Sequence, residues 1–324
     1  MNVMINTYCN LKCPYCFAED VMCAKTTSNQ MSLEDFKLVL DFHKQNNMRV
    51  VRLIGGEPTL HPQFKEFVNL IVQDDFFEGV HIFTNGTFSS DTALFLFNIP
   101  TNKGVTLLFN VNEDSYLKER REQVYNNVRL LSKRMNYVNG VESPCLTTIG
   151  INFYSPNQEY KFVIDLAEEC NIPYIRWSIT IPNTQEKIDY RTYVRSFFNL
   201  LIDFFYLCLI SGKQVTQDCN AIPLCAFEAE EIQEFLYLVP NLFTQTSCIP
   251  VFDVTPDLKV ARCFGMSEYQ EVNLLEYDNI QDLADEFNFL FRKIEKKILY
   301  PECESCAVFV RNGEKSCGCM KYRV

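Results

Sequence analysis

Three cysteines near the start of the chain, at spacing C-x3-C-x2-C, constrain the chemistry more than any other feature. They are Cys9, Cys13 and Cys16, and they come directly after a short apolar segment, Val3 to Tyr8. Three thiolates can hold three irons of a cubane [4Fe–4S] cluster, which leaves the fourth iron without a protein ligand. Clusters that only carry electrons normally have four cysteine ligands, so this spacing predicts an open coordination site where chemistry takes place.

Two simpler interpretations compete with this hypothesis. The pair Cys13 and Cys16 could form a thioredoxin-like redox motif, or it could supply half of a zinc site. A structural zinc site needs four ligands, however, and no second C-x2-C pair lies nearby in the sequence. A second motif favours the cluster: Gly55-Gly56-Glu57-Pro58 follows the next predicted strand, where glycines let the backbone approach a ligand closely.

Together the two motifs resemble those of the radical S-adenosylmethionine (SAM) superfamily. The resemblance implies that Cys9, Cys13 and Cys16 hold a [4Fe–4S] cluster as the catalytic centre, with SAM chelating the fourth iron. One electron from the cluster then cleaves SAM, and the 5′-deoxyadenosyl radical abstracts a hydrogen from the substrate. The resemblance also implies an electron donor such as flavodoxin or ferredoxin.

The same resemblance assigns SAM contacts to residues around the cluster. Tyr15 is expected to lie against the adenine. The Gly55–Pro58 turn is expected to bind the SAM amino group, through the Glu57 side chain or through backbone carbonyls. A side chain at Gly56 should therefore obstruct SAM while leaving the cluster in place.

Strand and helix patterns alternate along the first half of the chain. Such alternation indicates βαβ units with right-handed crossovers and a parallel α/β sheet. Six units are too few for a closed eight-stranded barrel, so we predict a partial (β/α)6 TIM-like barrel over residues 1–185. The six predicted strands are Met1–Thr7, Arg49–Ile54, Val80–Phe83, Val105–Val111, Thr147–Phe153 and Tyr174–Ile181.

Polar residues lie at or near the carboxyl ends of several predicted strands, the edge where parallel barrels place their active sites. The amides of Asn85, Asn112 and Asn152 could bind a ribose or a carboxylate there, although turn-forming asparagines explain each one equally well. Arg176 lies in a strand and needs an anion, for which the SAM carboxylate is a candidate.

After residue 185 the pattern changes to a helical linker or substrate region, 186–247, and then to a small cysteine-rich α+β domain, 248–324. This last domain resembles the SPASM and twitch extensions of radical SAM enzymes, which hold auxiliary [4Fe–4S] clusters. The match is partial, because the glycine of the family pattern is Leu258 here and the last cysteines run C-x2-C-x10-C-x-C. The first ligand set that we predict is Cys248, Cys263, Cys303 and Cys306, with Cys317 and Cys319 as close substitutes.

Two further cysteines, Cys219 and Cys225, raise the candidate ligands in this half to eight, which is enough for two clusters. The alternative is a structural zinc module that uses the same thiolates. The segment has too little apolar periodicity to fold unaided, so a bound metal should supply part of its stability.

The composition argues against several other classes of protein. The formal net charge is −11 and no run of Lys or Arg forms a basic stripe, which argues against nucleic-acid binding. No stretch of 18 apolar residues occurs, so no membrane span is predicted. Fifteen cysteines without a signal-peptide pattern indicate metal-bound thiolates in a reducing cytoplasm.

We therefore predict a radical SAM oxidoreductase or maturase that modifies a peptide or protein, the activity that such extensions often accompany. Action on a small molecule such as a sugar stays open as an alternative, and so does a non-catalytic iron–sulfur or zinc-binding protein. Production of 5′-deoxyadenosine would separate the enzyme from the non-catalytic protein. The sequence does not name the substrate.

Overall fold

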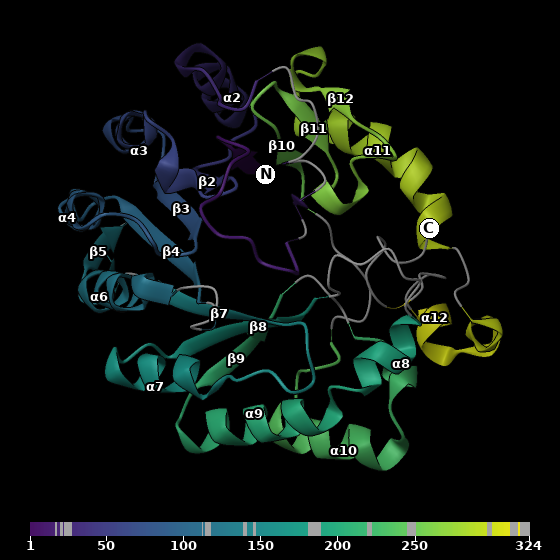
Figure 1. Cartoon of the computed structure of the whole chain (residues 1–324). Coiled ribbons are helices and arrows are strands. Elements are labelled where there is room, and N and C mark those ends of the chain that lie inside the picture. Colours follow the sequence, from purple (N-terminus) through teal and green to yellow (C-terminus); the bar gives the residue numbers. More distant parts are fainter. Residues whose placement is uncertain are drawn as a thin grey trace.

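The computed structural model describes residues 1–16, 18–19, 22, 28–111, 113, 118–138, 141–144, 147–180, 189–218, 222–244, 251–296, 300–311 and 317. One curved sheet organises them, with strand order β12-β11-β10-β1-β2-β3-β4-β7-β8-β9 (Figure 1). The strands from β1 to β9 in this order are parallel, and the sheet does not close, which confirms the predicted partial barrel. They are β1 (Asn2–Met4), β2 (Val50–Ile54), β3 (Gly79–Thr84), β4 (Gly104–Asn110), β7 (Thr147–Phe153), β8 (Tyr174–Ile179) and β9 (Gln214–Gln217).

Two elements differ from the prediction. Strand β9 extends the parallel sheet from a region expected to be helical; it has a single apolar residue, Val215, so its pairing with β8 rests on backbone hydrogen bonds. In the same region, the chain between residues 190 and 210 forms two separate helices, α8 (Tyr190–Arg195) and α9 (Phe198–Ile210), and not one continuous helix. The Ser196 hydroxyl donates to the Tyr193 carbonyl at 2.6 Å at the break, the kind of local side-chain bond that competes with a continuing helix.

The outer, convex side of the sheet is covered by helices (Figure 1). The first of them begins after Ser32, whose hydroxyl caps the helix by accepting the Asp35 backbone N–H at 3.0 Å. None of the described helices is long and apolar enough to cross a membrane. The covering helices are α2 (Leu33–Gln45), α3 (Phe64–Gln73), α4 (Ser90–Phe97), α6 (Arg121–Leu131), α7 (Lys161–Glu169) and α9.

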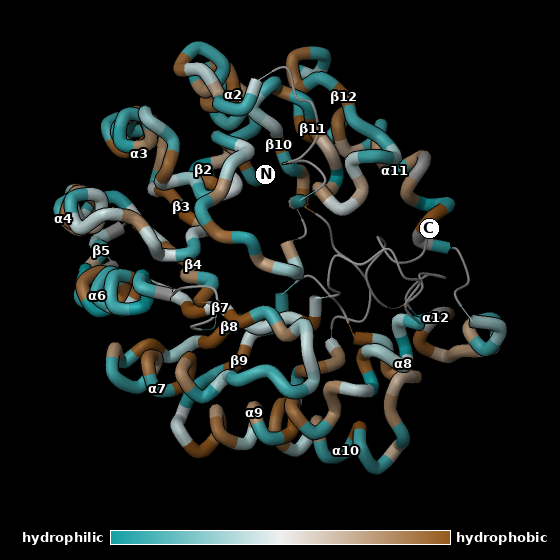
Figure 2. The backbone as a smooth tube through the Cα atoms, in the orientation of Figure 1, coloured by the Kyte–Doolittle hydropathy of each residue, from teal (hydrophilic) through white to brown (hydrophobic). Residues whose placement is uncertain are grey.

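The main hydrophobic core lies between the sheet and these helices. Alternate strand residues face outward into it, as the pleat of a strand requires. On β8, for example, Trp177 packs edge-on against Phe205 of α9, with ring centroids 5.0 Å apart. Figure 2 shows the result as long hydrophobic stretches along β8 and α9, whereas α6 is largely hydrophilic.

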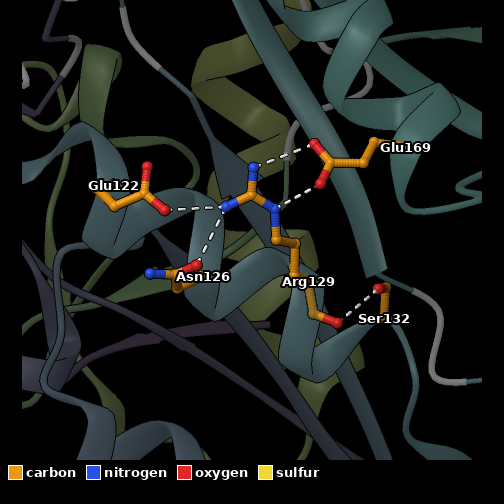
Figure 3. A network of polar contacts seen from close by, with 5 residues as sticks. All are labelled: Glu122, Asn126, Arg129, Ser132 and Glu169. Carbon is orange, nitrogen blue, oxygen red and sulfur yellow. Dashed lines mark hydrogen bonds and ion pairs between the residues drawn. The ribbon is translucent and has the colours of Figure 1, made fainter.

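Arg129 connects two of the outer helices through charged contacts (Figure 3). Its Nε and Nη2 atoms donate to the two carboxylate oxygens of Glu169, at the end of α7, at 2.6 and 3.1 Å. Its Nη1 atom donates to Glu122 and Asn126, earlier on α6, at 3.1 and 3.0 Å. Because these groups are exposed to solvent, the contacts orient α6 against α7 more than they stabilise either helix.

The concave side of the sheet carries a second, smaller apolar cluster. Its buried members are Met4 of β1, Ile54 of β2, Ala18 and Phe264 of the C-terminal half, and Cys16 packs against them. The first strands of the barrel and the C-terminal half therefore meet beside the cysteine loop.

The remaining elements belong mainly to the C-terminal half. The strands β10 (Asp253–Val254), β11 (Lys259–Ala261) and β12 (Val272–Asn273) extend the sheet beyond β1, with β10 parallel to β1 and the other two antiparallel. The helices are α10 (Ala229–Leu238), α11 (Ile280–Glu295) and α12 (Ala307–Arg311). A separate hairpin, β5 (Met135–Val138) and β6 (Val141–Pro144), follows α6.

A buried carboxylate, Asp253, joins β10 to the barrel. It accepts the Asn2 side-chain amide of β1 at 2.7 Å and the Phe264 backbone N–H at 3.0 Å. Burial raises the pKa of Asp253 to about 7, although these two hydrogen bonds and the amino terminus oppose the shift. The seam between the barrel and the C-terminal half therefore depends on pH.

The Asp253→Asn substitution removes this carboxyl group and should therefore remove its contribution to the pH dependence of stability. The folded protein binds the proton more tightly than the unfolded chain, whose Asp pKa is near 3.8. The contribution of Asp253 to the free energy of unfolding should therefore be highest below about pH 4 and fall as the pH rises toward 7, by at most about 1.4 kcal/mol per pH unit. Asparagine mimics the protonated acid, so the slope should flatten in denaturant titrations across this range. Asp285→Asn on the surface of α11 is the control, and an unchanged slope in Asp253→Asn would contradict the assignment.

Candidate active site

The three-cysteine loop follows β1 on the concave side of the sheet and is fixed by the turn after β2. The backbone N–H of Gly56 donates to the Asn6 carbonyl, and that of Glu57 donates to the Tyr8 carbonyl, both at 2.9 Å. The Asn6 side-chain amide also donates to the Tyr8 and Glu57 carbonyls at 3.1 and 3.0 Å. The Gly55–Pro58 turn therefore holds the segment that leads into Cys9.

The two glycines of this turn are needed for that close approach. A Cβ atom on Gly56 would lie 2.2 Å from the Tyr8 carbonyl oxygen and 2.8 Å from the Cys9 nitrogen. A Cβ atom on Gly55 would lie 2.3 Å from the Asn6 side-chain oxygen. Both lie against the cysteine loop, which differs from the expectation that a side chain here would obstruct only SAM.

Glu57 has a structural role that the sequence did not indicate. Its fully buried carboxylate accepts the hydroxyls of Thr59 and Thr84 at 2.6 and 2.8 Å. It also accepts the backbone N–H groups of Thr59 and Asn85 at 3.3 and 2.7 Å. Both carboxylate oxygens are hydrogen-bonded, so the side chain connects the turn after β2 to the end of β3. The short helix η1 (Pro58–Leu60) begins at the next residue, Pro58. The sequence predicted that either the Glu57 side chain or the backbone carbonyls of the turn bind the SAM amine, and that assignment stays a prediction.

Asn85, at the end of β3, lies against the first cysteine. Its amide nitrogen is 3.6 Å from the Cys9 sulfur and donates to the Asn10 side chain at 3.0 Å. Thr87 closes the network by donating to the side-chain oxygens of Asn85 and Asn10 at 2.7 and 3.2 Å. Sequence reasoning missed Asn10 and Thr87, whose only signal was their position next to a cysteine and to a turn.

Tyr15 and Asn152 meet on another side of the loop. The Tyr15 ring stacks on that of Tyr154, which follows β7, with centroids 5.0 Å apart. Burial raises the pKa of Tyr15 well above its usual value, and Cys13 adds to the shift while the Asn152 amide opposes it. Asn152 itself accepts the Ser178 hydroxyl at 2.6 Å. An aromatic stack thus covers the loop close to Cys13.

The positive charge of Arg176 is neutralised by a carboxylate of the protein itself. Its guanidinium forms an ion pair with Asp218, the residue after β9, and lies 5.6 Å from the centre of the Phe83 ring. The SAM carboxylate is therefore not needed to neutralise it. The sequence could not show this pairing because Asp218 is 42 residues away and β9 was not predicted.

The cysteines predicted to bind an auxiliary cluster lie in separate parts of the C-terminal half. Cys263 precedes the short helix η4 (Phe264–Met266), while Cys303 lies in η6 (Pro301–Ser305) and Cys306 follows it. Cys317 is half-buried. Asn112, Cys219, Cys248 and Cys319 lie outside the described residues.

The donor set of the first loop fits a cubane cluster. Burial, reinforced by Cys16 and Cys9, raises the pKa of the Cys13 thiol to about 12. Thiols this close repel each other once ionised, and bound iron relieves that repulsion. No three His, Cys, Asp or Glu side chains among the described residues converge on a single metal ion.

A Gly56→Ala substitution should disturb the cysteine loop itself. The added methyl group would meet the Tyr8 and Cys9 backbone, and such overpacking costs about 1–3 kcal/mol of stability. We expect less iron per chain after anaerobic reconstitution, together with a lower unfolding midpoint. Gly150→Ala is the matched control because its nearest contact is a side-chain atom, Asn110 Oδ1. Full iron content with weakened SAM binding would instead restore the sequence-based expectation.

A Glu57→Gln substitution should lower the stability of the protein in the absence of any cofactor. The side-chain NH2 of glutamine would replace one carboxylate oxygen and would face an N–H or O–H group that this oxygen now accepts. Two donors cannot bond to each other, and a buried polar group left without its hydrogen bond costs about 1–3 kcal/mol. Chemical denaturation of the apo protein measures this loss. Glu66→Gln, at an exposed site on α3, should have little effect. Unchanged apo stability in Glu57→Gln would show that the carboxylate is not structural.

Comparison with known proteins places this site in a family. Residues 3–166, about half of the chain, match the Radical SAM superfamily. GTP 3',8-cyclase from Desulforamulus reducens (strain ATCC BAA-1160 / DSM 100696 / MI-1) is 25% identical over 128 residues, 40% of this chain and 39% of that protein. The chain thus matches well under half the length of this relative. The tungsten-containing aldehyde ferredoxin oxidoreductase cofactor-modifying protein of Pyrococcus furiosus (strain ATCC 43587 / DSM 3638 / JCM 8422 / Vc1) is 23% identical, over 97% of this chain and 90% of that protein.

Solved structures share the fold. Streptococcus suis SuiB bound to S-adenosylmethionine superposes with a TM-score of 0.62 at 16% identity, over 94% of this chain and 70% of SuiB. SuiB bound to precursor peptide SuiA gives a TM-score of 0.55 at 15% identity, over 85% of this chain and 62% of SuiB. At such identities the likeness shows the fold, in agreement with the partial barrel. The family match and the fold together establish that this chain belongs to the radical SAM superfamily, whose cofactors are a [4Fe–4S] cluster and S-adenosylmethionine.

Proposed function

We propose that this protein is a radical SAM enzyme that abstracts a hydrogen atom from a peptide or protein substrate. The observation that carries the proposal is the loop of Cys9, Cys13 and Cys16, held at the carboxyl edge of the first strands by the Gly55–Pro58 turn. This is the edge of a parallel barrel at which active sites are found. When bound there, the cluster supplies the electron that cleaves SAM.

The residues around the loop have distinct tasks in this proposal. Asn85 donates toward the Cys9 sulfur, and hydrogen bonds to sulfur are one means by which proteins set cluster potentials. The stacked rings of Tyr15 and Tyr154 shield the loop from water. The backbone of the Gly55–Pro58 turn offers carbonyls to the SAM amine, because the Glu57 carboxylate is already engaged.

A peptide or protein is favoured as substrate by the extent of the similarities. The likeness to SuiB, one structure of which contains a precursor peptide, extends over most of this chain. The relative from Pyrococcus furiosus also matches nearly the whole chain, but it is named for modifying a cofactor, so it keeps a small-molecule substrate as the alternative. The match to GTP 3',8-cyclase, an enzyme named for a small molecule, covers only 40% of it. We also propose an auxiliary [4Fe–4S] cluster in the C-terminal half and a flavodoxin or ferredoxin as the electron donor.

A Cys13→Ala substitution should abolish SAM cleavage, because a cluster with two thiolate ligands is labile. Anaerobically reconstituted protein, reduced chemically, is assayed for 5′-deoxyadenosine by chromatography. The wild type should produce it and Cys13→Ala should not. Cys170→Ala, at the end of α7, is the matched control and should retain the wild-type rate. Turnover in Cys13→Ala would refute the proposed site, and acceleration of the wild type by GTP would favour a small-molecule substrate.

A further inference from the structure

An open groove of about 710 Å³ lies on the C-terminal half, along α11 and the chain segment that contains β12. These two elements lie beside each other at one end of the sheet (Figure 1). None of the residues that line the groove belongs to the cysteine loop or to the turn after β2. The lining includes three aromatic rings and three carboxylates, those of Tyr269, Tyr277, Phe289, Asp282, Asp285 and Glu286.

Both walls of the groove are fixed to the rest of the fold. The start of α11 is held by the Asn46 side chain, which accepts the Ile280 backbone N–H at 2.6 Å. The inner face of α11 is buried, and its Phe287 ring lies with its centre 5.6 Å from that of Phe252. On the other wall β12 pairs with β11, and the Gln270 side chain donates to Glu286 at 3.1 Å. The groove is therefore preformed.

Helical spacing places the groove residues of α11 on its outer face. Asp282, Glu286 and Phe289 are four and three residues apart, so they follow one line along the helix. Phe289 is 74% exposed and Tyr269, on the opposite wall, is 41% exposed. Single apolar side chains on a surface are ordinary, but two exposed rings that line one groove indicate a contact surface.

The carboxylates of the groove have no cationic partner among the described residues. Each accepts a hydrogen bond from an Asn or Gln amide, and none forms an ion pair. Elsewhere on the surface, Asp74 and Glu169 pair with Lys44 and Arg129 at 2.6 Å. The chain between residues 263 and 291 contains four Glu and three Asp and no Lys or Arg. The groove therefore lies in a region of uncompensated negative charge.

This negative charge extends to the rings. Burial raises the pKa of the Tyr277 phenol above its usual value, and Glu286 and Glu276 raise it further. The carboxylates do not suit a single metal ion, since no three candidate ligands converge in the part of the chain that the structure describes. An extended ligand with several positive charges therefore matches the groove better than one ion.

The protein already contains one contact of the expected kind. Lys293, one turn after Phe289 on α11, places its ammonium nitrogen 4.7 Å from the centre of the Phe289 ring. An ammonium or guanidinium group over an aromatic face is attracted by the electrons of the ring. A basic side chain in the groove would have both a ring and a carboxylate within reach.

The groove is also close to the cysteine loop along the chain. The Tyr269 backbone N–H donates to the Met266 carbonyl at 3.0 Å, at the end of η4. The first residue of η4, Phe264, belongs to the apolar cluster against which Cys16 packs. Five residues lead from Phe264 to Tyr269, which limits their separation to about 18 Å. A peptide of about ten residues is therefore long enough to reach from the groove to the loop.

We propose that this groove binds a basic segment of the peptide or protein substrate, with Lys or Arg side chains between the aromatic rings and the carboxylates. The inference rests on the proposed function for the identity of the ligand as a substrate, and it adds a recognition surface outside the active site. The groove holds one part of the substrate by charge and aromatic contacts while another part reaches the cysteine loop.

The test measures binding of a fluorescein-labelled peptide of about twelve alternating Lys and Gly residues to the anaerobically reconstituted protein. Fluorescence anisotropy at low salt gives the dissociation constant, because salt screens exposed charges. The groove variant combines Asp282→Asn, Asp285→Asn and Glu286→Gln. The matched control removes the same number of charges from exposed sites on α9 and α10, by Asp203→Asn, Glu230→Gln and Glu234→Gln. Circular dichroism verifies that each variant is folded.

The dissociation constant should rise about tenfold in the groove variant and little in the control. Phe289→Leu keeps an apolar side chain but removes the ring, and it should weaken binding about threefold. A peptide with Glu in place of Lys should not bind. Equal weakening in the groove variant and the control would assign binding to the net charge of −11 and overturn the proposal.

Two further outcomes would also overturn it. An oligomer of the wild type that dissociates in Phe289→Leu, as measured by light scattering, would assign the groove to a second copy of the chain. Failure of the Lys peptide to bind wild-type protein that cleaves SAM would refute the groove alone. Production of 5′-deoxyadenosine is measured separately, so its absence in the wild type would refute the proposed function without altering the binding result.

Discussion

The contact between the turn after β2 and the segment before Cys9 is the constraint on which the site depends. Two backbone hydrogen bonds, from Gly56 and Glu57, hold the cysteine loop against the turn, and no side chain fits between them. The buried Glu57 carboxylate then fixes the turn to the end of β3. The ends of β1, β2 and β3 are thereby tied together beside the thiols.

The two faces of the sheet differ in polarity: the outer face is apolar, and the inner face bears polar side chains. Outward-facing residues pack under the helices in one large core, which supplies the stability. Inward-facing positions include polar groups such as Asn152, Ser178 and Arg176, each with a partner inside the protein. Arg176 would be costly without Asp218, because a charge removed from water needs a counterion. Structural pairs of this kind leave the strand ends free for a cofactor.

The helix α8 contacts several separate segments of the chain. Arg191 and Arg195 organise the short helices that carry Cys225 and Cys303, and Tyr193 contacts the backbone next to the aromatic stack. The C-terminal half also joins the barrel at a second seam, through Asp253 between β10 and β1.

The sequence by itself determined the family, the parallel barrel and the cysteine loop, because these depend on local patterns. Alternating strand and helix periods indicate βαβ units, and C-x3-C-x2-C with Gly55-Gly56-Glu57-Pro58 is a local spacing of ligands and small residues. Only the tertiary structure decided the partners of individual polar groups. Glu57 and Arg176 each have a partner inside the protein, Thr84 and Asp218, which lies 27 or 42 residues away and which local patterns could not reveal. Spacing along a chain fixes what one loop can bind, whereas neighbours from distant segments are fixed by how the strands and helices pack.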